Sequence, residues 1–209
     1  MIKTGLFVLA ASALVGFNFA PAAASYDFAD PKGVSGLTLT IDSELEPVSG
    51  HANGVSGMVM FDPMNPEKST GKISIASKSV FLGSQAMTDA MHQNWALDVA
   101  KYPEITFEVK KVDNVKTAKM AGFWSARVTG DFTLHGVTKP LSVDVNVRRL
   151  ADSIQRRGGM EGVKGDLLAI RSKFSINRKD FGVAANLSES VIGNKVDIQL
   201  AFIGVSPKK

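Results

Sequence analysis

Much of this chain alternates apolar and polar residues with a period of two, and that pattern constrains the fold more than any other feature. In residues 126–135 the even positions are apolar or small, and in residues 141–148 the odd positions are apolar. Successive side chains of a β-strand point to opposite faces, so each segment is predicted to be a half-buried strand. Turn residues fill the break from Gly136 to Pro140, which predicts a hairpin.

Five further segments pass the same test as strands: residues 37–45, 72–82, 104–110, 170–176 and 196–202. Residues 54–61, which are apolar on both faces, are predicted to be one more strand. Eight strands of antiparallel type indicate either a sandwich or a closed barrel, and closure would remove the exposed edges of the sheet.

One segment departs from this pattern. Met87, Met91 and Trp95 follow each other at intervals of four, which predicts a short amphipathic helix. Ser84 or Thr88 can cap its N-terminus. We favour a helix that plugs one end of the barrel. The alternative is a mobile lid of methionine and aromatic side chains over the mouth of a pocket.

The N-terminus has the pattern of a secretory signal. Lys3 precedes an apolar run of 14 residues, 6–19, and Ala22 to Ala24 supply the small residues that a signal peptidase recognises. A membrane anchor would need about 20 apolar residues. Residues 1–24 are therefore predicted to be a signal peptide cleaved after Ala24, and residues 25–209 a single exported domain.

Composition excludes several classes of protein. The chain has no cysteine, which excludes disulfides, thiolate zinc, iron–sulfur clusters and a cysteine nucleophile. The net charge is +4, with bases scattered among acids, so no nucleic-acid partner is predicted. His51, His92 and His135 lack the i, i+4 spacing of a helical metal site, and no nucleotide-binding or hydrolase motif occurs. The sequence therefore predicts no metal site, no cofactor and no catalytic residue.

Four motifs, taken in order, resemble one known family. Residues 98–107 contain Tyr-Pro-Glu-Ile-Thr-Phe, and residues 134–140 read Leu-His-Gly-Val-Thr-Lys-Pro. Residues 178–182 read Arg-Lys-Asp-Phe-Gly, and residues 196–200 form the closing apolar alternation. Together they resemble the YceI-like, polyisoprenoid-binding proteins over roughly residues 55–203. The resemblance implies an all-β, eight-stranded antiparallel lipocalin-like barrel in the periplasm that holds a long isoprenoid or related amphiphile.

The candidate ligand-binding residues are apolar side chains predicted to face the barrel interior, joined by one aromatic residue of the helical stripe and one of the third motif. They are Phe61, Ile73, Phe107, Phe132, Leu134, Val143, Phe174 and Leu200, with Trp95 and Phe181. Such a set can hold an isoprenoid chain by burial alone, at about 25 cal/mol per Å² of apolar surface. The same residues would also make an ordinary filled core, and only the resemblance favours a hollow one.

Three polar residues of the motifs are candidate contacts at the barrel mouth: His135, Arg178 and Asp180. For Arg178 and Asp180 we favour the alternative that they form an ion pair on one strand face, and for His135 a hydrogen bond to the backbone. The basic pairs Arg148-Arg149, Arg156-Arg157 and Lys208-Lys209 suit either contact with anionic lipid headgroups or, as we favour, simple solvation of loops.

The predicted function is a periplasmic carrier or sequestering protein for a long-chain isoprenoid or fatty amphiphile. An enzyme acting on such a ligand inside the barrel is the main alternative, but the sequence offers no acid–base pair for it. A small outer-membrane barrel is a third class. It would place apolar residues outside and need aromatic girdles, and the chain has only two Trp and two Tyr.

Overall fold

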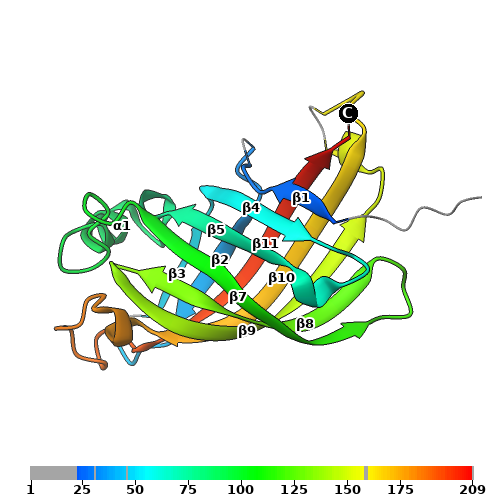
Figure 1. Cartoon of the computed structure of the whole chain (residues 1–209). Helices are drawn as coiled ribbons and strands as arrows, with labels where there is room; N and C mark the ends of the chain where they lie inside the picture. The colour runs from blue at the N-terminus through cyan, green and yellow to red at the C-terminus, as the bar shows by residue number, and fades with distance from the viewer. Residues whose placement is uncertain (1–22, 31, 46, 158–159, 209) are drawn as a thin grey trace, which may run out of the picture.

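The structure is a computed structural model of the 209-residue chain, and it describes residues 23–30, 32–45, 47–157 and 160–208. Eleven strands dominate these ranges (Figure 1). The strands are β1 (Ala24–Asp27), β2 (Gly36–Ile41), β3 (Val48–Ala52), β4 (Val55–Phe61), β5 (Thr70–Ala76), β6 (Phe81–Leu82), β7 (Glu104–Thr117), β8 (Phe123–Leu134), β9 (Val137–Leu150), β10 (Gly165–Asn177) and β11 (Lys195–Pro207). The helical segments are α1 (Gln85–Met91) and four 3-10 turns, η1 (Pro66–Lys68), η2 (Ser77–Ser79), η3 (Ile154–Arg156) and η4 (Arg178–Phe181).

Eight of the strands close into an antiparallel barrel. The first of them, β1, pairs with β4 on one side and with β11 on the other, so the sheet β1-β4-β5-β7-β8-β9-β10-β11 returns to its starting point. The remaining strands form an extension, in which β2 pairs with β11, β3 with β2 and β6 with β3. The expected eight-stranded antiparallel barrel with a short helix is therefore confirmed.

Individual strands differ from the prediction in three places. The segment 72–82 is not one strand but β5, η2 and β6. Alternation across a single strand predicts that Phe81 shares the face of Ile73, but Phe81 is exposed. The strand predicted for 37–45 ends at Ile41. The short strands β1 and β3 were not predicted, because four or five residues are too few to show a convincing alternation.

The β8–β9 hairpin has a much tighter turn than the five residues expected. Leu134 pairs with Val137, so only His135 and Gly136 form the loop. Their φ angles are +51° and +74°, as a two-residue type I′ turn requires at both positions. A Cβ on Gly136 would also overlap the ring of Tyr102. Glycine is therefore needed at this turn for two independent reasons.

The predicted orientation of this hairpin is confirmed. Residues at even positions of β8, such as Val128 and Phe132, and at odd positions of β9, such as Val143, face the barrel interior. Their neighbours face outward, where Arg127 binds Asp144 across the strands through two hydrogen bonds of 2.9 and 2.7 Å. Gly130 also faces inward, and the ring of Phe107 occupies the space that a side chain there would fill.

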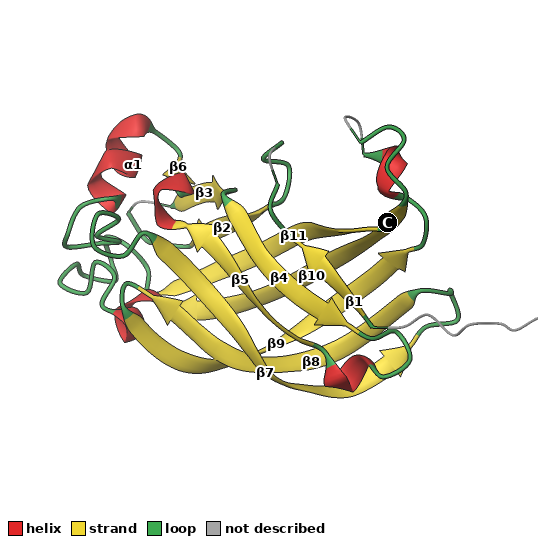
Figure 2. Ribbon diagram, turned by 45° about the horizontal axis from the view of Figure 1, so that its top comes forward, coloured by secondary structure: helices red, strands yellow, loops and turns green. Residues whose placement is uncertain are grey.

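The two ends of the barrel are covered by turns and short helices (Figure 2). At one end lies α1, capped by Ser84, whose hydroxyl accepts a hydrogen bond from the Met87 N–H at 3.2 Å. At the other end, η3 and the segment after β1 fold over the opening, and Phe28 and Ile154 are fully buried there. Closure of both ends leaves the middle of the barrel as the place for a ligand.

Candidate ligand-binding cavity

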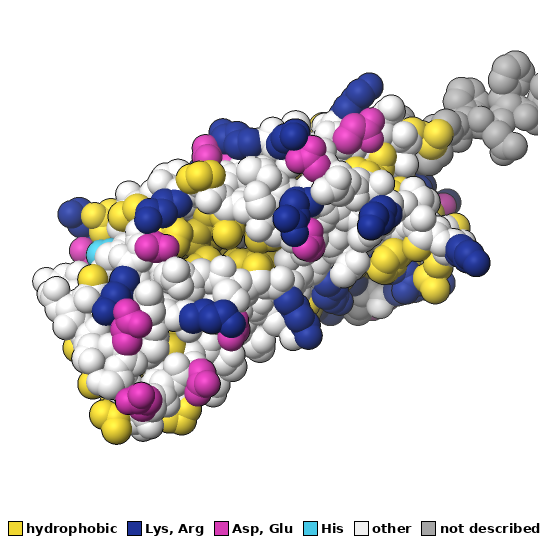
Figure 3. All heavy atoms as spheres, turned by 90° about the horizontal axis from the view of Figure 1, so that it is seen from below, with side chains coloured by type: hydrophobic (Ala, Val, Ile, Leu, Met, Phe, Trp, Pro, Cys, Tyr) yellow, Lys and Arg dark blue, Asp and Glu magenta, His cyan; other side chains and the backbone are white. Residues whose placement is uncertain are grey.

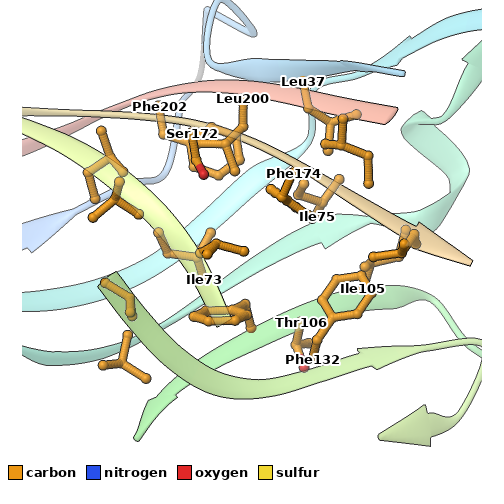
Figure 4. Close-up of a pocket in the computed structure, with 18 of the residues that line it drawn as sticks. Leu37, Ile73, Ile75, Ile105, Thr106, Phe132, Ser172, Phe174, Leu200 and Phe202 are labelled. Carbon is orange, nitrogen blue, oxygen red and sulfur yellow. The ribbon is translucent and has the colours of Figure 1, made fainter. Parts of the chain in front are cut away.

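The barrel is hollow. It encloses a cavity of about 250 Å³ that extends between the two covered ends. Side chains from β2, β4, β5, β7, β8, β9, β10 and β11 converge on this space, as the labelled Ile73, Phe132 and Phe174 illustrate (Figure 4). Apart from Ser69, Thr70, Thr106, Ser172 and Arg178, the lining consists of apolar residues, glycine and proline.

The exposure of the inward-facing residues is consistent with an empty centre. Phe107, Phe174 and Leu200 lie on inner faces of the barrel wall but are only partly buried. In a close-packed core such side chains would lose nearly all of their accessible surface. They instead border the cavity, so the alternative of a fully filled core is wrong.

The cavity is not sealed from solvent on every side. Seen from below, hydrophobic side chains lie at the bottom of a hollow that is surrounded by Lys, Arg, Asp and Glu side chains (Figure 3). Thr70, at the start of β5, is exposed and yet contributes to the cavity lining. The lining therefore reaches the surface near the β4–β5 connection.

Eight of the ten apolar residues predicted from the sequence line the cavity. They are Phe61, Ile73, Phe107, Phe132, Leu134, Val143, Phe174 and Leu200. Their contact with a ligand remains a prediction. The cavity is completed by residues that were not among the predicted ligand contacts, among them Leu82, Leu97, Val183 and Met91 of the predicted helical stripe, all at the α1 end. These four come from loops and short elements, where no alternation marks the inner face.

Two of the predicted apolar residues lie elsewhere. Trp95 follows the end of α1, is 43% exposed and does not line the cavity, because α1 is too short to carry the helical stripe that far. Phe181 is buried and packs edge-on against Phe132 with ring centroids 5.3 Å apart. It supports the cavity wall without reaching the cavity.

Arg178 is the one charged residue among the cavity-lining residues that the structure describes, and its side chain is almost fully buried. All five of its N–H groups donate to backbone carbonyls, with Nε bonded to Gly193 at 2.9 Å and Nη2 to Ile192 at 2.7 Å. The remaining three bonds go to Val183, Ala184 and Leu187. Burial lowers the pKa of Arg178 from its ordinary value. The guanidinium organises the loop between η4 and β11.

The predicted ion pair between Arg178 and Asp180 does not form. Residues 178–181 are the 3-10 turn η4 and not a strand, so the two side chains do not share a face. Asp180 is exposed and lies 3.8 Å from Lys139. His135 makes the backbone contact that we favoured, with Nδ1 3.1 Å from the Phe181 carbonyl oxygen. Neither Asp180 nor His135 lines the cavity.

Two arginines of the predicted basic pairs form ion pairs within the protein. Arg149 and Arg157, which we expected to be solvated loop bases, form largely buried ion pairs with Asp166 and Asp30. Lys208 also contacts Asp166, at 3.2 Å. These charges fasten the end of the barrel opposite α1.

Within the described ranges, no group of three or more His, Cys, Asp or Glu side chains is placed to hold a metal ion. Among the same residues, no helix combines the length and apolarity that crossing a membrane requires.

A closed antiparallel barrel around an apolar cavity defines the class of hydrophobic ligand-binding barrels. A family model described as the YceI-like domain matches residues 18–203. The chain therefore belongs to the YceI-like family.

Known relatives agree in sequence and in fold. A "UPF0312 protein" of Pseudomonas fluorescens is 31% identical over 163 residues, which cover 77% of this chain and 76% of the relative. The crystal structure of Burkholderia cenocepacia BcnA is similar with a TM-score of 0.63 at 19% identity, covering 81% of this chain and 95% of that one.

A polyisoprenoid binding domain from Saccharophagus degradans, implicated in plant cell wall breakdown, is similar with a TM-score of 0.60 at 16% identity. The match covers 88% of this chain and 99% of that domain. At such low identity, the two structural similarities show a shared fold.

Proposed function

We propose that this protein is an exported, periplasmic binding protein that holds one long-chain apolar amphiphile, a polyisoprenoid or similar lipid, inside the barrel for transport, storage or sequestration. The observation that carries the proposal is the cavity itself, a hollow lined by apolar side chains in the middle of a closed barrel. A chain of isoprene units or methylene groups gains about 25 cal/mol for each Å² of apolar surface that it buries there. The name of the Saccharophagus degradans domain supports the same class of ligand.

Binding is better supported than catalysis. An enzyme acting on the lipid would need a positioned acid–base pair at the ligand. Arg178, the titratable residue in the described lining, has its N–H groups engaged by carbonyls and stays protonated. The residues around the ligand can therefore bind and orient it, which is what a carrier requires.

Export rests on the N-terminal sequence. Residues 1–22 lie outside the described residues, and β1 begins at Ala24. Cleavage after Ala24 would leave Ser25 at the start of β1 and retain Tyr26, which is fully buried in the barrel. N-terminal sequencing of the protein from its native host should begin at Ser25, and an intact Met1 on the folded protein would contradict export by this signal.

The ligand can be identified directly. The protein is purified from its native host without detergent, and an organic extract is examined by mass spectrometry. We expect a long-chain isoprenoid or fatty amphiphile in near-stoichiometric amount. An extract without lipid, from a protein that also fails to bind such chains when they are added, would overturn the proposal.

A further inference from the structure

The polar side chains of the cavity lining differ in whether they can hydrogen-bond a ligand. This difference indicates where the polar end of a bound chain lies. Arg178, near the α1 end, has no free N–H to offer. The hydroxyl of Ser172, in the middle of β10, donates to the Asp144 carbonyl at 2.7 Å. Thr106 lies in register with Thr133, in the outward-facing row of the wall. Arg178 and Ser172 therefore have their donors engaged, and Thr106 belongs to the outward-facing row of β7.

Ser69 is different. It follows η1, in the connection between β4 and β5, and it lines the cavity. Its Oγ atom is buried and has no hydrogen-bond partner among the described residues. A buried hydroxyl without a partner costs about 1–3 kcal/mol, and rotation about one side-chain bond lets it seek a partner in the cavity. A polar atom of a ligand would supply that partner.

The barrel wall is also interrupted beside Ser69, and a second interruption lies at the α1 end, where residues 137–144 of β9 and 173–177 of β10 do not pair with each other. Pairing between β5 and β7 ends at Lys72 and Glu108, so residues 109–117 of β7 have β8 on one side and η1 packed against the other. Because exposed Thr70 lines the cavity next to Ser69, the lining reaches the surface at this connection. At the opposite end, Leu82, Met91 and Leu97 line the cavity and are buried.

We propose that the bound chain lies with its polar end at the β4–β5 connection, hydrogen-bonded to Ser69, and with its apolar tail toward α1, and that this polar end is uncharged. The inference rests on the proposed function and adds the class of head group: an alcohol, amide or ester. A phosphate or diphosphate inside the cavity would find no free cationic donor in the described lining, and burying an unpaired charge is costly.

The orientation can be measured because the chain contains no cysteine. Single-cysteine variants Ser69→Cys and Met91→Cys are treated with an isoprenyl bromoacetate, whose thiol-reactive group sits at the polar end. Bromoacetamide, which lacks the chain, corrects for intrinsic thiol reactivity. After this correction, mass spectrometry should show alkylation at position 69 at least about tenfold faster than at position 91. Faster alkylation at position 91 would overturn the orientation.

The head-group class has its own test. Wild type is titrated with geranylgeraniol, geranylgeranyl diphosphate and a saturated hydrocarbon of equal length, and we expect the alcohol to bind most tightly. Ser69→Ala should lower the affinity ratio of alcohol to hydrocarbon by roughly 2- to 10-fold, the size of one hydrogen bond. Thr129→Ala, which removes a hydroxyl from the outer face, should leave that ratio unchanged.

The outcomes separate this inference from the proposed function. If none of the three chains binds to wild type, the proposed function fails. If the chains bind but the diphosphate binds more tightly than the alcohol, or if Ser69→Ala leaves the ratio unchanged, the inference fails and the proposed function stands.

Discussion

At the scale of single residues, Arg178 shows how one side chain can fix a long loop. Its guanidinium donates to five carbonyl groups of residues 183–193, of which the Ala184 carbonyl also accepts a hydrogen bond from the Leu187 N–H. Five donors in a rigid planar group are a property of arginine alone. The arginine of the third motif is therefore needed for the architecture of the α1 end, and not for an ion pair with Asp180.

This role predicts unequal effects of two substitutions. Arg178→Met should lower the free energy of unfolding by at least about 3 kcal/mol, because several buried carbonyls lose their donor at once. Asp180→Ala removes an exposed contact with Lys139 and should cost no more than about 1 kcal/mol. Urea denaturation of both variants measures the difference, and losses of similar size would contradict the role assigned to Arg178.

The sequence predicted residues of the cavity wall far better than residues at its ends. Phe107, Phe132 and Phe174 are found because a strand with one wet and one apolar face reveals its inner side by alternation. Leu97 and Val183 lie in loops, and Arg178 binds backbone carbonyls, which every sequence has. Their positions depend on tertiary contacts, so no local pattern could have indicated them.

At the scale of elements, the hairpin of β8 and β9 forms the part of the barrel wall whose orientation is most strongly determined. A shift of one residue would turn every apolar side chain of either strand to the outside. The two-residue turn at His135 and Gly136 prevents such a shift, because its length and positive φ angles fix the register. The sequence predicts a turn of five residues because Thr138 and Pro140 are typical of turns. In the structure both belong to β9.

The register predicts that neighbouring residues respond differently to the same change. Phe132→Asp would place an unpaired carboxylate in the cavity wall and should unfold or severely destabilise the protein. Thr133→Asp changes an outward-facing residue and should alter the free energy of unfolding by about 0.5 kcal/mol or less. Thermal melts of the two variants test this, and comparable losses would rule out the register.

The barrel end opposite α1 is fastened by buried charges that make it sensitive to acid. Burial alone raises the pKa of Asp166, but hydrogen bonds from the Asp152 N–H, Lys208 and Arg149 lower it by more, so the net shift is downward. A carboxylate with a lowered pKa in the folded state contributes stability above its unfolded pKa of about 3.9. That contribution is lost as the pH falls through the folded pKa.

An asparagine at this position should weaken the pH dependence. Asp166→Asn removes the titrating group, so the variant should be less stable than wild type at pH 7 but lose less stability between about pH 4 and pH 2. Free energies of unfolding from urea titrations at several pH values measure both effects. Parallel pH profiles for the two proteins would show that Asp166 does not supply the acid sensitivity.

At the scale of the whole molecule, the number of strands in the closed barrel determines how much space lies inside it. Eight strands give an interior that side chains can fill or that can hold one small ligand. Partial burial of Phe107, Phe174 and Leu200 places this protein in the second group. Residues at the cavity wall should therefore contribute more to ligand binding, and less to stability, than residues of a close-packed core.

Three phenylalanines provide a matched comparison. Phe28 is fully buried outside the cavity, with its ring against Gly204, and Phe28→Ala should cost about 3–5 kcal/mol. Phe107→Ala and Phe174→Ala should cost less in delipidated protein, since each ring already borders empty space, and both should weaken lipid binding. Equal losses of stability at all three positions would indicate a filled barrel.

The most direct test of the central claim is a thermal melt of delipidated wild-type protein at increasing concentrations of a long-chain isoprenoid alcohol. A ligand that binds only the folded state stabilises it in proportion to the logarithm of its concentration above the dissociation constant. We predict a melting temperature that rises continuously over that range, with a smaller rise for Phe107→Ala and Phe174→Ala. A melting temperature unchanged by the alcohol and by fatty amphiphiles would contradict the assignment of this barrel as a carrier of such chains.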